Sequence, residues 1–279
     1  MVMGILNVTP DSFSDGGRYL ERNDAVSRAS TMIEEGADVI DIGPESTRPG
    51  AIETPDDEQL RRALPVVRAL RMLNPDVVLS IDTRSARVAA ECLAAGADMI
   101  NDVSAMRDDP DMPRVAARSG AAVILMHRRG TSATMQDGGG PRYEEVIGEI
   151  VEFLRDRTTR AVEAGVNAAR ILHDPGIGFG KRAEDNLLIL RHLDRFTSLG
   201  HPVLIGASRK RFLEPITGVL NPADRDEASV HCAMLATWTG ASMVRVHDVQ
   251  ATVRALRFAQ AVRRADGVYQ GQATGPGNG

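Results

Sequence analysis

Residues 38–50 read D-V-I-D-I-G-P-E-S-T-R-P-G, a short β-branched run that stops at a loop rich in polar groups. The run is typical of a buried strand because it is apolar, short and bounded by glycine and proline. The loop that follows carries a carboxylate, two hydroxyls and an arginine. The same arrangement of apolar run and polar end recurs along the whole chain, and it predicts the fold.

Eight short apolar runs alternate with longer amphipathic stretches, such as Glu58–Leu73 and Tyr143–Ala164, that have a helical period. The expected strands are Val2–Val8, Asp38–Ile42, Val77–Ile81, Asp98–Asn101, Ala121–Met126, Arg170–His173, Pro202–Gly206 and Ser242–Val246. Repeated strand–helix units indicate parallel strands with crossover helices. We therefore predict a single α/β domain, a (β/α)8 TIM barrel, over residues 1–265. An open doubly wound sheet is the alternative, but its glycine-rich first turn is absent.

The composition limits the classes of function. The 279 residues are 43% hydrophobic and carry a formal net charge of −5, which argues against nucleic acid or an anionic membrane as partner. No apolar run approaches a membrane span of roughly 18 residues and no signal peptide is recognisable, so we expect a cytoplasmic protein. Only two lysines occur, Lys181 and Lys210, both beside glycine-rich segments. Residues 266–279 lack an apolar period and are expected to be a disordered tail.

A polar residue stands at or just past the C-terminal end of every expected strand. These residues are Asn7, Asp41, Asp82, Asn101, His127, Asp174, Ser208 with Lys210, and Arg245 with His247. Barrel enzymes place their sites at this end of the strands. Asn, Asp and Ser could instead cap the following helices, but arginine and histidine are not capping residues. We therefore expect a functional site at this rim.

One part of this collection suits a planar heterocycle. Asp82, Asn101 and Asp174 can accept adjacent N–H donors, and Lys210 can donate to ring acceptors. Met126 and Phe179 are expected to lie above and below the ring. Asp82 taken alone is more typical of a cap or a turn.

The other part of the collection suits an anion. Arginine matches phosphate oxygens with two donors, and an asparagine oxygen can help to hold Mg²⁺ against a diphosphate. The candidates for the diphosphate are Asn7, Thr47, Arg48, Arg245 and His247. Asp41 and Glu45 are interpreted as buried organisers of the loop that follows the second strand, and His127 as a residue with local hydrogen bonds.

Several motifs in order along residues 1–260 resemble the dihydropteroate synthase family of pterin-binding barrels. They are G-I-L-N-V-T-P-D-S-F-S-D-G-G (4–17), E-S-T-R-P-G (45–50), S-I-D-T (80–83), I-N-D-V-S (100–104), L-M-H (125–127), D-P-G-I-G-F-G-K (174–181), G-A-S-R-K-R-F (206–212) and V-R-V-H-D-V (244–249). The resemblance implies an enzyme that condenses a dihydropterin methyl diphosphate with 4-aminobenzoate, releases pyrophosphate and is a target of sulfonamides.

The resemblance also implies roles for individual residues. The residues that would bind the pterin are Asp82, Asn101, Met126, Asp174, Phe179 and Lys210, and those that would bind the diphosphate are Asn7, Thr47, Arg48, Arg245 and His247. The residues that would bind 4-aminobenzoate are Phe13, Pro49, Phe179, Lys210 and Arg211, and those that would bind Mg²⁺ are Asn7 and Asp11. The residues expected to act in catalysis are Asp15, Arg48, Lys210, Arg245 and His247. A homodimer is implied as well. For Trp238 either a core or an interface position fits, and core is favoured.

The chain departs from the family pattern at several positions, two of which concern the site and the barrel, and two rival functions stay open. Pro44 replaces a glycine, and His173 occupies a position that is usually aliphatic. His173 and Asp174 should point to opposite sides of their strand, so His173 is expected to face the helices. The rivals are a folate-dependent methyltransferase, which needs no diphosphate residues, and a catalytically idle pterin-binding paralogue.

Overall fold

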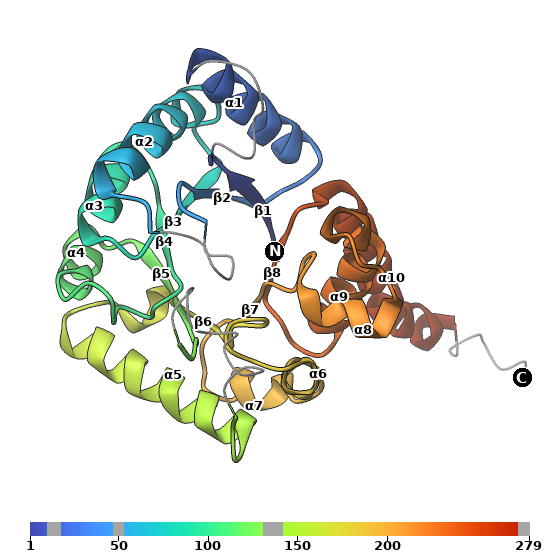
Figure 1. Cartoon of the computed structure of the whole chain (residues 1–279). Coiled ribbons are helices and arrows are strands. Elements are labelled where there is room, and N and C mark those ends of the chain that lie inside the picture. Colours follow the sequence, from blue (N-terminus) through green and yellow to red (C-terminus); the bar gives the residue numbers. More distant parts are fainter. Residues whose placement is uncertain (10–17, 47–52, 131–141, 273–279) are drawn as a thin grey trace, which may run out of the picture.

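The computed structural model describes residues 1–9, 18–46, 53–130 and 142–272, with the backbone only for 18–21 and 266–272. Its centre is a ring of parallel strands (Figure 1). The strands are β1 (Val2–Asn7), β2 (Val39–Gly43), β3 (Val78–Asp82), β4 (Met99–Asp102), β5 (Ala122–Met126), β6 (Ile171–Asp174), β7 (Leu204–Ile205) and β8 (Met243–Val246). They follow the order β6-β5-β4-β3-β2-β1-β8-β7, and a single bridge between His173 and Val203 joins the two ends of the sheet.

Helices surround the ring and connect successive strands. They are α1 (Arg18–Glu34), α2 (Asp56–Leu73), α3 (Ala86–Ala94), α4 (Met112–Ser119), α5 (Val146–Glu163), α6 (Ala183–Arg191), α7 (Leu193–Thr197), α8 (Glu214–Thr217), α9 (Asp226–Trp238) and α10 (Val249–Gln272), with short 3₁₀ turns η3 (Ala168–Arg170), η4 (Arg211–Leu213) and η5 (Pro222–Arg225). The predicted TIM barrel is confirmed. Within the described part of the chain, no helix is long and apolar enough to span a membrane.

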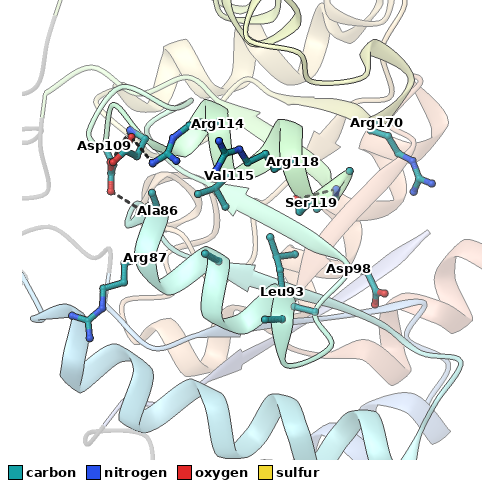
Figure 2. Close-up of a pocket in the computed structure, with 16 residues that line it drawn as sticks. Ala86, Arg87, Leu93, Asp98, Asp109, Arg114, Val115, Arg118, Ser119 and Arg170 are labelled. Carbon is teal, nitrogen blue, oxygen red and sulfur yellow. Dashed lines mark hydrogen bonds and ion pairs between the residues drawn. The ribbon is translucent and has the colours of Figure 1, made fainter.

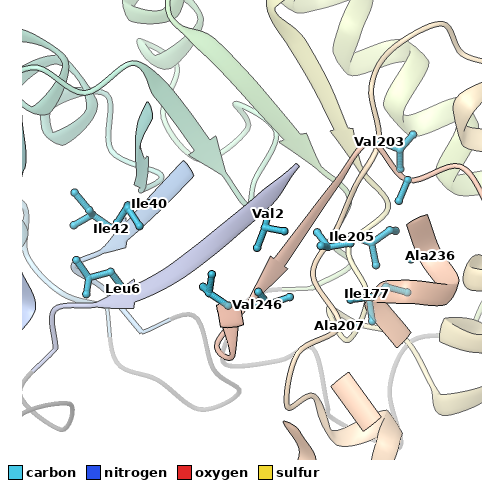
Figure 3. Close-up of a cluster of buried hydrophobic side chains, with 14 of the residues drawn as sticks. Val2, Leu6, Ile40, Ile42, Ile177, Val203, Ile205, Ala207, Ala236 and Val246 are labelled. Atoms are coloured by element: carbon cyan, nitrogen blue, oxygen red, sulfur yellow. The ribbon is translucent and has the colours of Figure 1, made fainter. Parts of the chain in front are cut away.

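The strands pack on two sides, as their alternation requires. One set of side chains fills the barrel interior: Met3, Val39, Met99, Ile124, Leu204 and Met243. The alternate set, which includes Leu6, Ile40, Ile42, Ile205 and Val246, packs outward in the larger cluster with the helices (Figure 3). Continuous apolar runs therefore form strands here because both faces are buried.

The same alternation places polar side chains inside the barrel mouth. Counting by twos from Met3 on β1 gives Asn7, and counting from Val39 on β2 gives Asp41. Asp82 and Asn101 are paired in register on β3 and β4, and Met126 pairs with Asp174 across β5 and β6. The strand ends thus gather the predicted polar residues at one rim, as expected.

His173 lies on the outer side of β6, as predicted, and contacts a helix. Its Nε2 is 2.7 Å from Thr158 Oγ1 on α5, and its ring lies 4.6 Å from that of His201. Its Nδ1 has no hydrogen-bond partner among the described residues. Burial lowers the pKa of His173 to about 4, and the nearby His201 lowers it further.

This histidine should make the fold sensitive to acid. Because its pKa is about 4 in the folded state and 6.5 by itself, the unfolded chain takes up the proton first as the pH falls. His173 should therefore cost about 2 kcal/mol of unfolding free energy at pH 5 relative to pH 8. His173→Leu should remove that loss, measured by urea denaturation at both values. His231→Gln, at an exposed position, is the control; an unchanged acid loss in His173→Leu would contradict the assignment.

Two expectations at the C-terminal end of the chain turn out differently or stay open. Trp238, favoured as a core residue, is 47% exposed at the end of α9, so the core assignment is wrong. Helix α10 continues past the expected domain boundary at residue 265 to Gln272. Residues 273–279 lie outside the described residues, and the disordered tail stays a prediction.

Candidate active site

Arg245 occupies the centre of the polar rim and ties three strands together. It reaches from β8 to donate from Nε to Asp41 Oδ2 at 2.6 Å and from Nη2 to Asp82 Oδ2 at 2.8 Å. Asn101 Nδ2 donates to the same Asp41 oxygen at 3.0 Å. The structure therefore brings Arg245 next to the predicted pterin residues, although the sequence analysis grouped it with the diphosphate residues.

Burial controls the charges in this cluster. It raises the pKa of Asp82 to about 7, against the effect of the Arg245 guanidinium, and the carboxylate of Asp41 adds to the rise. The pKa of Arg245 is raised because Asp41 and Asp82 outweigh the effect of its own burial. The cluster holds its arginine charged and leaves Asp82 close to titration at neutral pH.

Asp41 is more central than the sequence analysis assumed. It is fully buried, and its Oδ1 has no partner among the described residues although Oδ2 has two. A buried oxygen without a partner is costly unless a ligand or water supplies a donor. Its inward position on β2, two residues from Val39, is the sequence signal that identifies it as a site residue.

The loop after β6 shapes the next part of the rim. Asp174 Oδ1 accepts a hydrogen bond from Gly176 N at 2.7 Å, which closes the Asp-Pro-Gly turn. Gly176 has φ +73°, and a Cβ there would lie 1.9 Å from the His127 carbonyl oxygen, so only glycine fits. Burial raises the pKa of Asp174, while Lys210 opposes this rise.

Lys210 faces this loop from the segment after β7. Its ammonium donates to the Ile177 carbonyl and lies 4.4 Å from the centre of the Phe179 ring. Burial lowers the pKa of Lys210 to about 8, although Asp174 raises it. The structure thus brings Asp174, Phe179 and Lys210 together, as the sequence analysis predicted.

Lys181, the other lysine, is a supporting residue that the sequence analysis noticed but gave no role. Its Nζ lies 2.9 Å from His127 Nδ1 and 2.8 Å from Gly176 O, with Phe179 O at 3.1 Å. Burial lowers the pKa of Lys181 well below its usual range, although Asp174 opposes this. His127 thus has local contacts, as interpreted, and helps to hold the loop that carries Asp174 and Phe179.

The remaining predicted residues are distributed around this centre. His247 Nδ1 lies 2.9 Å from Ser208 Oγ, which also accepts from the His247 backbone N–H at 3.2 Å. Met126 is buried at the end of β5, and Arg211 is exposed at the start of η4. The predicted residues Asp11, Phe13, Asp15, Thr47, Arg48 and Pro49 lie outside the described residues.

Among the described residues, no group of three His, Cys, Asp or Glu side chains is arranged to hold a metal. Asn7 is nevertheless a suitable single oxygen donor at the mouth. Its Oδ1 lies 3.4 Å from the point that a Cβ on Gly43 would occupy, which is an ordinary van der Waals contact. One amide oxygen fits an ion that takes most of its ligands from a diphosphate.

A separate hollow lies away from this rim. It is a groove of about 960 Å³ on the outer side of the barrel between α3 and α4, lined by residues that include Arg87, Arg114 and Arg118 (Figure 2). Its arginine lining is partly neutralised, because Arg87 pairs with Asp57 and Arg114 with Asp111. The inward-pointing groups of the rim remain the candidate active site.

Fold and rim together define a barrel enzyme whose buried acids and cations face the C-terminal ends of the strands. The pattern of the pterin binding enzyme family matches residues 3–247. The chain belongs to the pterin binding enzymes and, within them, to the dihydropteroate synthase family.

Individual relatives cover nearly the whole chain. Dihydropteroate synthase of Synechocystis sp. is 44% identical over 263 residues, which are 94% of this chain and 90% of that protein. The Xanthomonas albilineans dihydropteroate synthase with 4-aminobenzoic acid is 46% identical with a TM-score of 0.87, covering 94% of this chain and 92% of that one. The same enzyme in complex with 7,8-dihydropteroate is 43% identical with a TM-score of 0.84, covering 94% and 93%.

Proposed function

We propose that this chain condenses (7,8-dihydropterin-6-yl)methyl diphosphate with 4-aminobenzoate to give 7,8-dihydropteroate and pyrophosphate. The observation that carries the proposal is the inward cluster of Asp82, Asn101, Asp174, Lys210 and Arg245 in a chain that aligns almost end to end with dihydropteroate synthases. One of these relatives is solved with 7,8-dihydropteroate bound. The chain is accordingly a transferase, and its relatives favour this activity over a methyltransferase.

Pterin recognition is assigned to the acids and amide of the rim. Asp174 uses one oxygen for its own turn, which leaves Oδ2 for a ligand N–H. Asp82 and Asn101, paired in register on adjacent strands, present further groups to the ring edge. Lys210 donates to the ring acceptors, and Met126 and Phe179 enclose the faces. The unpaired Asp41 oxygen at the base of the site suits one more ligand donor.

Departure of the diphosphate is assigned to cationic groups. Arg48, Arg245 and His247 stabilise the negative charge that develops on the leaving oxygens, and Thr47 and Asn7 position them. Asn7 and the predicted Asp11 would hold Mg²⁺, which would neutralise part of the diphosphate charge. Because heterolysis next to the electron-rich dihydropterin leaves a stabilised cation, departure can precede attack, and Asp15 is assigned to steady that cation.

The 4-aminobenzoate then attacks from a pocket assigned to Phe13, Pro49, Phe179, Lys210 and Arg211. Phe179 and the Lys210 ammonium are already in contact, and Arg211 is exposed next to Lys210 where a carboxylate can reach it. An aromatic amine that meets a carbocation needs no strong base to activate it. The aniline proton is lost after the C–N bond forms.

The decisive experiment is a coupled pyrophosphate-release assay with the pterin diphosphate and 4-aminobenzoate. Release should require both substrates and Mg²⁺, and sulfamethoxazole should compete with 4-aminobenzoate. Mass detection of 7,8-dihydropteroate identifies the product. If no pyrophosphate is released while a pterin still binds, the idle paralogue becomes the better interpretation.

The predicted homodimer is proposed to form through α9 and α10, which pack side by side (Figure 1). Four large apolar side chains of these helices have exposed fractions from 45% to 68%: Leu235 and Trp238 on α9, and Phe258 and Val262 on α10. Arg263 of α10 lies over the Trp238 ring, so the two helices present one continuous face. Such a patch is typical of an interface.

Phe258→Asp should convert the dimer to a monomer, because a charge would be buried in the apolar interface. Light scattering after gel filtration at several concentrations measures the mass. Leu220→Asp, at an exposed apolar position outside these two helices, is the matched control and should leave the mass unchanged. A wild-type protein that is monomeric at high concentration would refute the assignment. The cytoplasmic location and the lack of a nucleic-acid partner stay predictions.

A further inference from the structure

An alternating chain of charges joins four neighbouring loops of the rim. Glu45 follows β2, Arg84 follows β3, Asp108 follows β4 and Arg128 follows β5. Arg84 Nη2 donates to Glu45 Oε2 at 3.0 Å and Arg84 Nη1 to Asp108 Oδ2 at 2.7 Å. Arg128 Nη2 then donates to Asp108 Oδ1 at 2.6 Å. We call these four residues the rim chain.

The rim chain also fixes both ends of the loop after β2. The Glu45 carboxylate accepts the backbone N–H of Thr54 at 3.0 Å, so residues before and after the loop are tied together. Arg84 adds a second link, because it lies 3.3 Å from the carboxylate of Glu53. Gln59 Nε2 donates to Thr54 O at 2.8 Å and secures the same end to α2. Arg84 is therefore the cation that joins the two ends of this loop to the barrel.

The charges of the rim chain are largely shielded from water and depend on one another. The side chains of Glu45 and Arg128 are only 4% and 7% exposed. The pKa of Asp108 is lowered despite its burial, because Arg84 and Arg128 both donate to it. Removal of one partner from such a set leaves the opposite charge buried and unpaired. Screening by salt is weak at this burial, so the chain should act as a fixed positioning device.

We propose that Arg84 is a positioning residue for the second substrate: it holds the two ends of the loop after β2, through Glu45 and Glu53, and thereby controls the binding of 4-aminobenzoate. The inference rests on the proposed function, in which residues of that loop serve diphosphate departure and the amine. Among the described residues, Arg84 makes no hydrogen bond or ion pair with a residue assigned to the pterin. Its loss should therefore separate the two substrates.

The test compares Arg84→Met, which keeps length and removes charge, with Arg87→Met in the first turn of α3, the helix that follows Arg84. Arg87 lies on α3 (Figure 2). It is exposed, and among the described residues its ion pair is with the exposed Asp57. Arg84→Met should raise KM for 4-aminobenzoate at least tenfold, while the Kd of a pterin measured by calorimetry stays within twofold. Arg84→Lys should recover part of the loss. Arg87→Met should match the wild type.

Asp108→Asn provides a second route if Arg84→Met folds poorly. Alone it should raise KM for 4-aminobenzoate, and combined with Arg84→Met it should add little, because both variants break the same chain. If pterin affinity fell by the same factor as KM for 4-aminobenzoate rose, Arg84 would have a general structural role, and that outcome would overturn the proposal. So would additive effects of the two variants.

Hydrogen exchange of the Thr54 amide gives a readout that does not depend on turnover. Its N–H is bound by Glu45, and exchange should accelerate at least tenfold in Arg84→Met but not in Arg87→Met. Unchanged exchange would overturn the proposed anchoring. Suppose that the wild type released no pyrophosphate while exchange of the Thr54 amide still accelerated in Arg84→Met. In that case the proposed function would fail and the anchoring would stand.

Discussion

Asp174→Asn is expected to weaken pterin binding by at least about 100-fold, because it replaces an acceptor by a donor in a buried site. Oδ1 of Asp174 accepts from Gly176 N at 2.7 Å, and an asparagine oxygen can keep that bond. The turn should therefore survive. The amide nitrogen would then occupy the place of Oδ2 and oppose the N–H donors of the ligand, with no charge to attract them. Calorimetric titration with a pterin measures the effect.

The matched control for this variant is Asp185→Asn. Asp185 is as buried as Asp174, but it lies at the start of α6, where its carboxylate pairs with Arg182. Asp185→Asn should reduce stability and leave the pterin Kd within threefold of the wild type. Pterin binding by Asp174→Asn within threefold of the wild type would show that Asp174 does not recognise the ligand.

Arg245→Met is expected to lower the unfolding free energy by roughly 3–5 kcal/mol, because it leaves Asp41 and Asp82 buried without their cation. The deficit should shrink as the pH falls. Asp82 has a pKa raised to about 7, so the stability that goes with its protonated form is present at low pH and is lost as the pH rises through that value. Urea denaturation at pH 5.5 and pH 8 measures both effects.

A charge-balanced partner variant separates this electrostatic cause from lost packing. Asp41→Asn combined with Arg245→Met removes one charge of each sign and should recover part of the lost stability, whereas two independent effects would add. Turnover should be lost in both proteins, because Arg245 is assigned to the site. A double variant that is less stable than Arg245→Met alone would contradict the charge-pairing account.

The barrel was predictable because its strands are apolar on both faces and end in polar residues. β3 and β8 begin within one residue of their expected starts, since burial and glycine or aspartate at the ends define them. The seventh strand was expected over Pro202–Gly206 and contains only Leu204–Ile205. On the β6 side this segment makes only a single bridge, between Val203 and His173, so few of its residues are paired as a strand. The local sequence pattern does not indicate how many residues will pair with a neighbouring strand.

The sequence predicted which residues lie at the site better than it predicted which of them contact one another. Asp82, Asn101 and Asp174 converge because strand ends of a barrel meet at one rim. Arg245 was grouped with the anion residues, yet it donates hydrogen bonds to Asp41 on β2 and Asp82 on β3, more than 160 positions earlier in the chain. Arg84 and Asp108 each look like ordinary charged loop residues in the sequence. Their link becomes visible only when four loops are brought side by side.

The two lysines have a practical consequence for chemical labelling. Apart from the N-terminal amine, they are the only primary amines of the chain, and both stand at the candidate active site. Burial lowers the pKa of both lysines, but Lys181 is buried and enclosed by carbonyl oxygens and His127, whereas Lys210, with a pKa of about 8, is partly exposed to solvent. An amine-reactive reagent should therefore modify Lys210 in preference to Lys181. Protection of Lys210 by a bound pterin would then report occupancy of the site directly, without any turnover.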